Sequence, residues 1–94
     1  MKTKIIDILP RQRMEYFLSL DYIGKEFQDK EIHTVYCLDS EKFLIVDGHT
    51  RYYSKLLEGK RIINNHLFGI QPFTKFFKNG TPKVDWNNLI KVGG

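Results

Sequence analysis

Cysteine is nearly absent from this chain: among its 94 residues there is one, Cys37. A single cysteine excludes a disulfide within the chain and a zinc site built from several cysteines. Low cysteine content is also typical of proteins kept in a reducing compartment. We therefore expect a cytoplasmic protein in which Cys37 is a small buried hydrophobic residue.

Long apolar runs are missing as well. None approaches the roughly 20 residues that span a bilayer, and the short apolar stretch near the start is interrupted by Asp7. That stretch does not have the pattern of a signal peptide. The sequence also contains no internal repeat and no low-complexity segment. These absences predict a protein that does not interact with membranes and is not built from repeats.

The composition that is present suits one small folded domain covering residues 1–94. Hydrophobic residues make up 41% and charged residues 28% of the chain, and seven Phe, five Tyr and one Trp supply large packing surfaces. Fifteen Lys and Arg against eleven Asp and Glu give a net charge of +4. This mild positive charge favours phosphate-bearing partners, either nucleotide or nucleic acid, without requiring them.

The first half of the chain predicts two strands and a helix. Residues 4–9 form a short apolar run that Pro10 ends, as expected of a strand. Apolar residues at helical spacing predict a helix over 14–23, with Gly24 at its C-terminal end. Residues 32–38 are rich in β-branched and aromatic residues, which favours a second strand.

The second half begins with a continuous apolar run, residues 43–46, which predicts a central strand paired in a hairpin with 32–38. A helix follows and ends near Gly59, and residues 61–68 predict another strand. We expect a turn at Asn79-Gly80. Residues 85–90 predict a final helical turn whose Trp86, Leu89 and Ile90 pack on the core.

The order strand, helix, strand, strand, helix, strand predicts an α/β (α+β) fold, with helices packed against one mixed sheet. We expect residues 4–68 to form its core and residues 69–94 an aromatic and basic extension.

The most informative segment is Asp47-Gly48-His49-Thr50-Arg51, directly after the apolar strand. Glycine lets the backbone bend and lets a ligand approach closely. The first amides of the following helix lack intrahelical partners and bind anions. Arg51 adds a planar charged group that suits phosphate, and His49 and Thr50 add hydrogen-bonding groups. Asp47 is a candidate to hold Mg²⁺ or to accept a proton.

The surrounding sequence FLIVDGHTRYYSKLLEGK, residues 43–60, resembles the signature of the ParB/sulfiredoxin superfamily. In that signature an apolar strand runs into a DGHxR or GxxR turn and a helix follows. The resemblance implies a ParB/sulfiredoxin-like fold and nucleotide binding at the turn. Gly48 and Arg51 match the branch that binds CTP. Asp47, Gly48, His49 and Arg51 match the branch that includes ADP-dependent free serine kinases.

The resemblance also implies candidate chemistry. Asp47 and His49 would be catalytic, Gly48, His49, Thr50 and Arg51 would hold phosphate, and ATP, ADP or CTP would bind with Mg²⁺ at Asp47. The kinases use an acidic residue after the first strand as a base, and Glu15 is the candidate here. The reaction would be phosphoryl transfer or nucleotide hydrolysis.

Two alternatives remain open. One is a ParB-like DNA-binding or nuclease module, because the tail alternates Lys75, Lys78 and Lys83 with aromatic residues, and such patterns bind single strands. Core packing of those aromatics, with the lysines outside, is the favoured interpretation of the tail. The other alternative is a non-catalytic interaction domain. The sequence leaves the oligomeric state undetermined.

Two arginines and two histidines outside the turn can each be interpreted as functional or as ordinary surface or structural residues. Arg11 and Arg13 could reach a nucleotide, although a solvated connector is the favoured interpretation. His33 and His66 are interpreted as surface histidines or as histidines satisfied by neighbouring groups.

Overall fold

The structure is a computed structural model that describes residues 1–15 and 30–93. Its helices and strands, in chain order, are β1 (Lys2–Lys4), the 3₁₀ helix η1 (Ile5–Asp7), β2 (Ile8–Leu9), β3 (Ile32–Cys37), β4 (Lys42–Asp47), α2 (His49–Leu57), β5 (Ile62–Gln71), β6 (Lys75–Phe76), β7 (Pro82–Lys83) and β8 (Ile90–Lys91). Met14 and Glu15 are helical, and the rest of the helix predicted over 14–23 lies outside the described residues.

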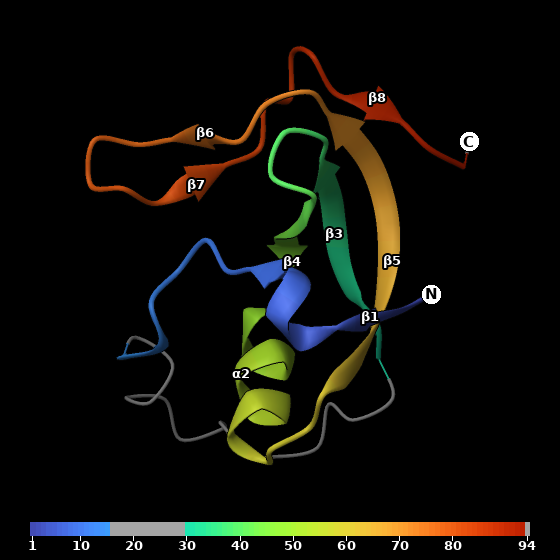
Figure 1. Cartoon of the computed structure of the whole chain (residues 1–94), viewed down its shortest axis with the longest axis vertical. Coiled ribbons are helices and arrows are strands. Elements are labelled where there is room, and N and C mark those ends of the chain that lie inside the picture. Colours follow the sequence, from blue (N-terminus) through green and yellow to red (C-terminus); the bar gives the residue numbers. More distant parts are fainter. Residues whose placement is uncertain (16–29, 94) are drawn as a thin grey trace.

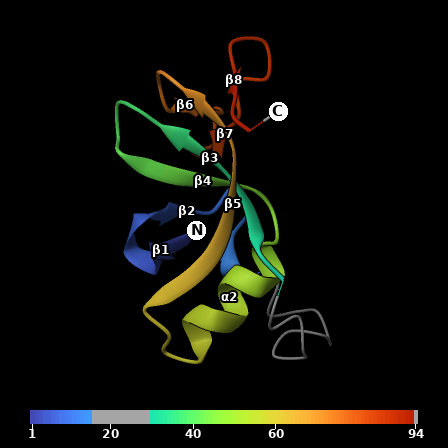
Figure 2. The same cartoon turned by 90° about the vertical axis from the view of Figure 1, so that its right-hand side faces the viewer.

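Six strands form one mixed sheet in the order β1-β5-β3-β4-β2, with β8 added along β5. The pairs β3/β5 and β2/β4 are parallel, whereas β1/β5, β3/β4 and β5/β8 are antiparallel. Helix α2 lies at one end of the curled sheet, and the β6–β7 hairpin projects from the other end (Figures 1 and 2). This is the predicted α/β (α+β) fold with a mixed sheet.

The segment predicted as one strand over 4–9 is instead two strands separated by η1. β1 pairs with β5 at one edge of the sheet, and β2 pairs with β4 at the other edge. The short helix between them gives the three isoleucines of this segment different environments, because Ile5 and Ile8 are buried while Ile6 is exposed. The prediction of one strand was wrong because strand propensity does not reveal that the segment crosses between edges.

The hairpin of β3 and β4 is confirmed. β4 is an interior strand, flanked by β3 and β2, while β3 occupies the middle of the sheet. The buried residues form two hydrophobic clusters, and β4 contributes to both. Leu44 and Ile45 are adjacent and fully buried, but they belong to different clusters. The first cluster packs under α2 and contains Ile5, Ile8, Ile32, Ile45, Tyr52, Tyr53 and Ile63. The second contains Val35, Cys37, Leu44 and Val84.

Cys37 is fully buried in the second cluster, as expected of a small hydrophobic residue. Its pKa is raised, chiefly because burial disfavours the thiolate. A thiol in this environment is poorly nucleophilic.

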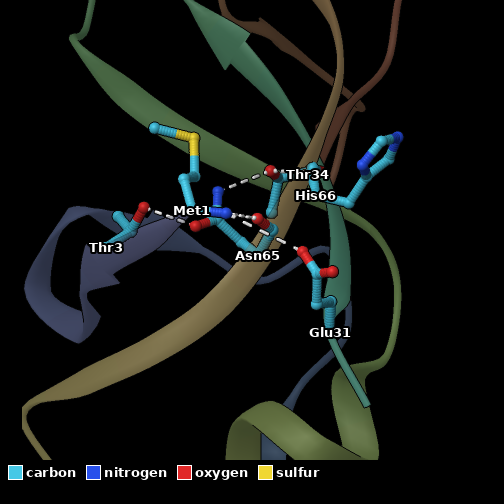
Figure 3. A network of polar contacts seen from close by, with 6 residues as sticks. All are labelled: Met1, Thr3, Glu31, Thr34, Asn65 and His66. Atoms are coloured by element: carbon cyan, nitrogen blue, oxygen red, sulfur yellow. Dashed lines mark hydrogen bonds and ion pairs between the residues drawn. The ribbon is translucent and has the colours of Figure 1, made fainter.

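A buried polar network fastens β1 to the sheet (Figure 3). The Thr3 hydroxyl donates to Oδ1 of Asn65 at 2.6 Å, and Nδ2 of Asn65 donates to the Thr34 hydroxyl at 3.0 Å. Asn65 is fully buried, so these bonds satisfy an amide that would otherwise be costly to bury. The Met1 ammonium donates to the Asn65 carbonyl at 2.8 Å and lies 3.8 Å from the Glu31 carboxylate.

The C-terminal region differs from its prediction. The turn at Asn79-Gly80 is confirmed, but residues 86–88 form a turn instead of a helix, and Ile90 enters β8. Leu89 packs against the second core cluster, whereas Trp86 and Ile90 are exposed. Trp86 instead meets Phe68 edge-on, with ring centroids 6.0 Å apart. The end of the segment predicted as a helical turn therefore forms a strand that pairs with β5.

Candidate functional site

The turn between β4 and α2 has the predicted conformation. β4 ends at Asp47, Gly48 has a φ of 104° in the left-handed region, and α2 begins at His49. Few residues other than glycine adopt this conformation without strain. The residue at the start of α2, Gly48, has no side chain with which to cap the helix. The positive end of the helix dipole lies at this turn, which is the arrangement that favours anions.

Three strands bring polar side chains together beside this turn. His33 on β3 is the register partner of Asp47 on β4 and also of His66 on β5. Register partners share a face of the sheet, and the two imidazole rings lie 5.7 Å apart edge to face. Asp47, His33 and His66 thus form one row across adjacent strands.

An irregularity in the pairing of β3 with β4 determines which β4 residue joins this row. The register between β3 and β4 shifts between His33 and Thr34, as at a β-bulge. Val46 is left without a partner at this shift, so Asp47, one residue farther along, lies opposite His33. Regular pairing would have placed an apolar valine there. The bulge therefore provides the row with its carboxylate.

Arg51 folds back across the turn from the first turn of α2. A Cβ atom added to Gly48 would lie 2.8 Å from Nη2 of Arg51 and 2.9 Å from Ile32, so only glycine leaves room for the guanidinium. Nη2 lies 3.7 Å from Oδ2 of Asp47, whose side chain is 74% exposed. The Arg51 side chain is 17% exposed, and within the described residues its buried Nε has no hydrogen-bond partner.

These side chains line one open pocket of about 600 Å³. Its lining residues are Lys30, Glu31, His33, Asp47, Arg51 and His66. Of the residues singled out in the turn, Asp47 and Arg51 line this pocket. Lys30 and Glu31 were not singled out from the sequence, and His33 and His66 were interpreted as ordinary surface or satisfied histidines. Only the strand register, which joins distant segments, reveals that these residues meet.

His49 is directed away from the pocket and into the fold. It is 7% exposed, and its Nε2 accepts a hydrogen bond from the backbone N–H of Arg11 at 2.8 Å. Burial, the largest cause, and the nearby Arg11 charge together lower the pKa of His49 to about 4, while the Asp47 charge opposes the shift. The imidazole is therefore neutral at physiological pH, and its Nε2 is an acceptor already in use.

Tyr53, one helical turn after His49, holds the same segment. Its hydroxyl donates to the carbonyl of Gln12 at 2.6 Å. Burial raises the pKa of Tyr53 to about 12, with smaller contributions from Tyr52 and Glu15. His49 and Tyr53 thus fix the connector against α2 and bring Arg11 to the turn. Within the described residues, the buried Nε of Arg11 also lacks a hydrogen-bond partner.

The remaining candidates lie apart from the pocket lining. Glu15 is exposed beside Tyr53, and Thr50 is half-buried in the first turn of α2. Neither residue lines the pocket. The described residues also contain no cluster of three or more His, Cys, Asp or Glu placed to hold a metal ion. Of the two carboxylates that line the pocket, Glu31 lies 3.8 Å from the Met1 ammonium, which leaves Asp47 as the candidate to hold a cation.

Residues 1–15 and 30–93 include no helix that is long and apolar enough to cross a bilayer. No family model, curated protein or solved structure matches the chain.

Proposed function

We propose that the pocket beside the β4–α2 turn binds the phosphate groups of a nucleotide such as ATP, ADP or CTP. The observation that carries the proposal is Arg51, an arginine at the turn whose side chain is largely buried and whose Nε has no hydrogen-bond partner among the described residues. Burying a donor without a partner is costly. An anion in the pocket would satisfy that donor and the charge together.

Three of the other lining residues support an anionic ligand, and the one that would oppose it, Glu31, is paired with the Met1 ammonium at 3.8 Å. Lys30 adds a second cation, and His33 and His66 add ring nitrogens that can donate hydrogen bonds to phosphate oxygens. The N-terminal amides of α2 start beside Arg51. A volume of about 600 Å³ is within the usual range for small-molecule sites.

Asp47 suits the Mg²⁺ ion that accompanies nucleoside phosphates. Its carboxylate is exposed at the pocket and has a long contact with Arg51 at 3.7 Å. Mg²⁺ in such sites is typically held by one or two carboxylates together with the substrate phosphates. One exposed aspartate is compatible with this mode, in which the nucleotide itself completes the ion's coordination.

The roles of the turn residues divide accordingly. Gly48 makes room for Arg51, and Arg51 meets the phosphate. His49 contributes through position: its acceptor nitrogen fixes the Arg11 backbone, which brings a further guanidinium to the turn. Glu15 does not line the pocket, so the proposal assigns it no phosphate contact.

A thermal-shift titration of the wild type with ATP, ADP, CTP and GTP, each with Mg²⁺, tests the proposal. One of them should raise Tm by about 5 °C or more once its concentration is far above Kd. Arg51→Ala should lose the shift. Lys55→Ala is the matched control, because it removes one positive charge from the same helix at a position that does not line the pocket.

No shift with any nucleotide, or an equal shift in Arg51→Ala and the wild type, would overturn the proposal. Product analysis of the same mixtures separates a nucleotide-binding module from a hydrolase or a phosphotransferase, because only the latter two consume the nucleotide.

A further inference from the structure

The hairpin of β6 and β7 carries an unusual number of exposed rings. Phe73, Phe76 and Phe77 are 64%, 60% and 54% exposed, and Trp86, just after the hairpin, is 55% exposed. We call residues 73–86 the aromatic arm. Core packing was the favoured interpretation of these rings, and the structure contradicts it. Exposed aromatic clusters on small domains commonly mark binding surfaces.

Hydrogen bonds join the base of the arm to the sheet and also link its two strands near the tip. Gln71 is fully buried, its Oε1 accepts from the Asp85 N–H at 2.8 Å, and its Nε2 donates to the Phe73 carbonyl at 2.9 Å. Val84 is buried in the second core cluster. At the tip, the Phe77 N–H donates to the Thr81 carbonyl at 2.7 Å. The rings are thus presented on ordered backbone, which lowers the entropic cost of binding.

The charge on the arm is positive. It carries Lys75, Lys78 and Lys83 against one acidic residue, Asp85. Asp85 is already paired with Lys75 at 2.6 Å, and the hydrogen bond from Lys75 is the main reason that its pKa is lowered. Lys83 lies over the Phe77 ring, 5.3 Å from its centroid. The arm therefore carries lysine ammonium groups close to exposed aromatic rings in the sequence.

We infer that the aromatic arm binds single-stranded nucleic acid, with bases stacked on the exposed phenylalanines and phosphates beside Lys78 and Lys83. Aromatic rings interleaved with lysines match the alternation of bases and phosphates along a single strand. Duplex bases are stacked on each other and cannot reach the rings. A second copy of the arm would bring like charges together, which disfavours self-association through this surface.

This surface is separate from the nucleotide pocket. The arm projects from the end of the sheet opposite α2 (Figure 1), and no residue of the arm lines the pocket. The inference therefore does not depend on the proposed nucleotide binding.

Fluorescence anisotropy with labelled thymidine and uridine homopolymers of about 15 nucleotides tests the inference. We expect the wild type to bind these strands more tightly than a duplex of equal length, and binding to weaken between about 50 and 200 mM salt. Phe77→Ala should weaken binding roughly ten-fold without lowering Tm, because the ring is exposed. Lys78→Ala should weaken binding more than Lys60→Ala, which removes an exposed lysine outside the arm.

The inference would be overturned by the absence of binding at low salt or by equal losses of binding in Lys78→Ala and Lys60→Ala. Displacement of the oligonucleotide by excess ATP would also overturn it, because it would place the strand at the turn. Sedimentation that detects a dimer broken by Phe77→Ala, with no oligonucleotide bound, would make the arm a protein interface instead.

Discussion

His49 shows how a residue in a motif can act through the fold. Its side chain is buried and neutral, and it accepts a backbone hydrogen bond from the connector before the first predicted helix. The histidine therefore contributes to stability in a way that depends on its protonation state. A substitution at this position would change the proposed nucleotide binding only indirectly, through the placement of Arg11.

Acidification should destabilise the protein through His49. The pKa of His49 is about 4 in the folded protein, below its ordinary value of 6.5. Between these values the unfolded chain binds a proton that the folded protein excludes, so stability is full above about pH 6.5 and falls as the pH drops toward 4. The loss should be about 2 to 3 kcal/mol.

Urea denaturation at about pH 7 and about pH 4.5, for the wild type and His49→Asn, measures this loss. Asparagine keeps an acceptor for the Arg11 amide but does not titrate. Stability should fall less in the variant across this range. Equal losses in both proteins would show that other groups cause the pH dependence.

At the scale of elements, the attachment of β1 depends on one buried amide. Asn65 connects Thr3 on β1 with Thr34 on β3 and is fully buried (Figure 3). Removing it would leave the Thr3 hydroxyl buried without its acceptor and would open a small cavity. Asn64, the next residue along β5, is exposed.

Asn65→Ala should lower the free energy of unfolding by about 2 to 3 kcal/mol, because buried polar groups would lose their partners. Asn64→Ala, the same substitution one residue away, should change it by about 0.5 kcal/mol or less. Chemical denaturation of both variants checks the difference. Similar losses at the two positions would mean that strand propensity, and not the network, dominates.

Structural features encoded by residues adjacent in the sequence could be predicted, whereas features that depend on pairing between distant strands could not. The Asp47-Gly48 turn and the helix after it were predictable because adjacent residues encode them. The row of Asp47, His33 and His66 was not, because it needs the pairing of three strands and a register shift. The predicted helical turn near Trp86 failed for the same reason, since long-range pairing with β5 overrode local preference.

At the scale of the whole molecule, two hydrophobic clusters share one strand. Leu44 faces the cluster with Val84, and its neighbour Ile45 faces the cluster under α2. Side chains alternate across a strand, so β4 cannot leave one cluster without disturbing the other. The two clusters should therefore unfold together.

Val84→Ala tests this coupling. It should lower stability by about 2 kcal/mol, with equal midpoints for the far-ultraviolet signal of α2 and the fluorescence of Trp86, the single tryptophan. Val92→Ala is the control, because Val92 is exposed. Separate midpoints would show that the second cluster melts independently of the helix.

The position of Arg51 over Gly48 also has an evolutionary consequence. The guanidinium occupies the space that any side chain at position 48 would need, and the positive φ independently favours glycine. Selection for an arginine at position 51 therefore constrains position 48 as well. Among diverging descendants of this chain, a side chain at position 48 should be found only where position 51 has ceased to be an arginine.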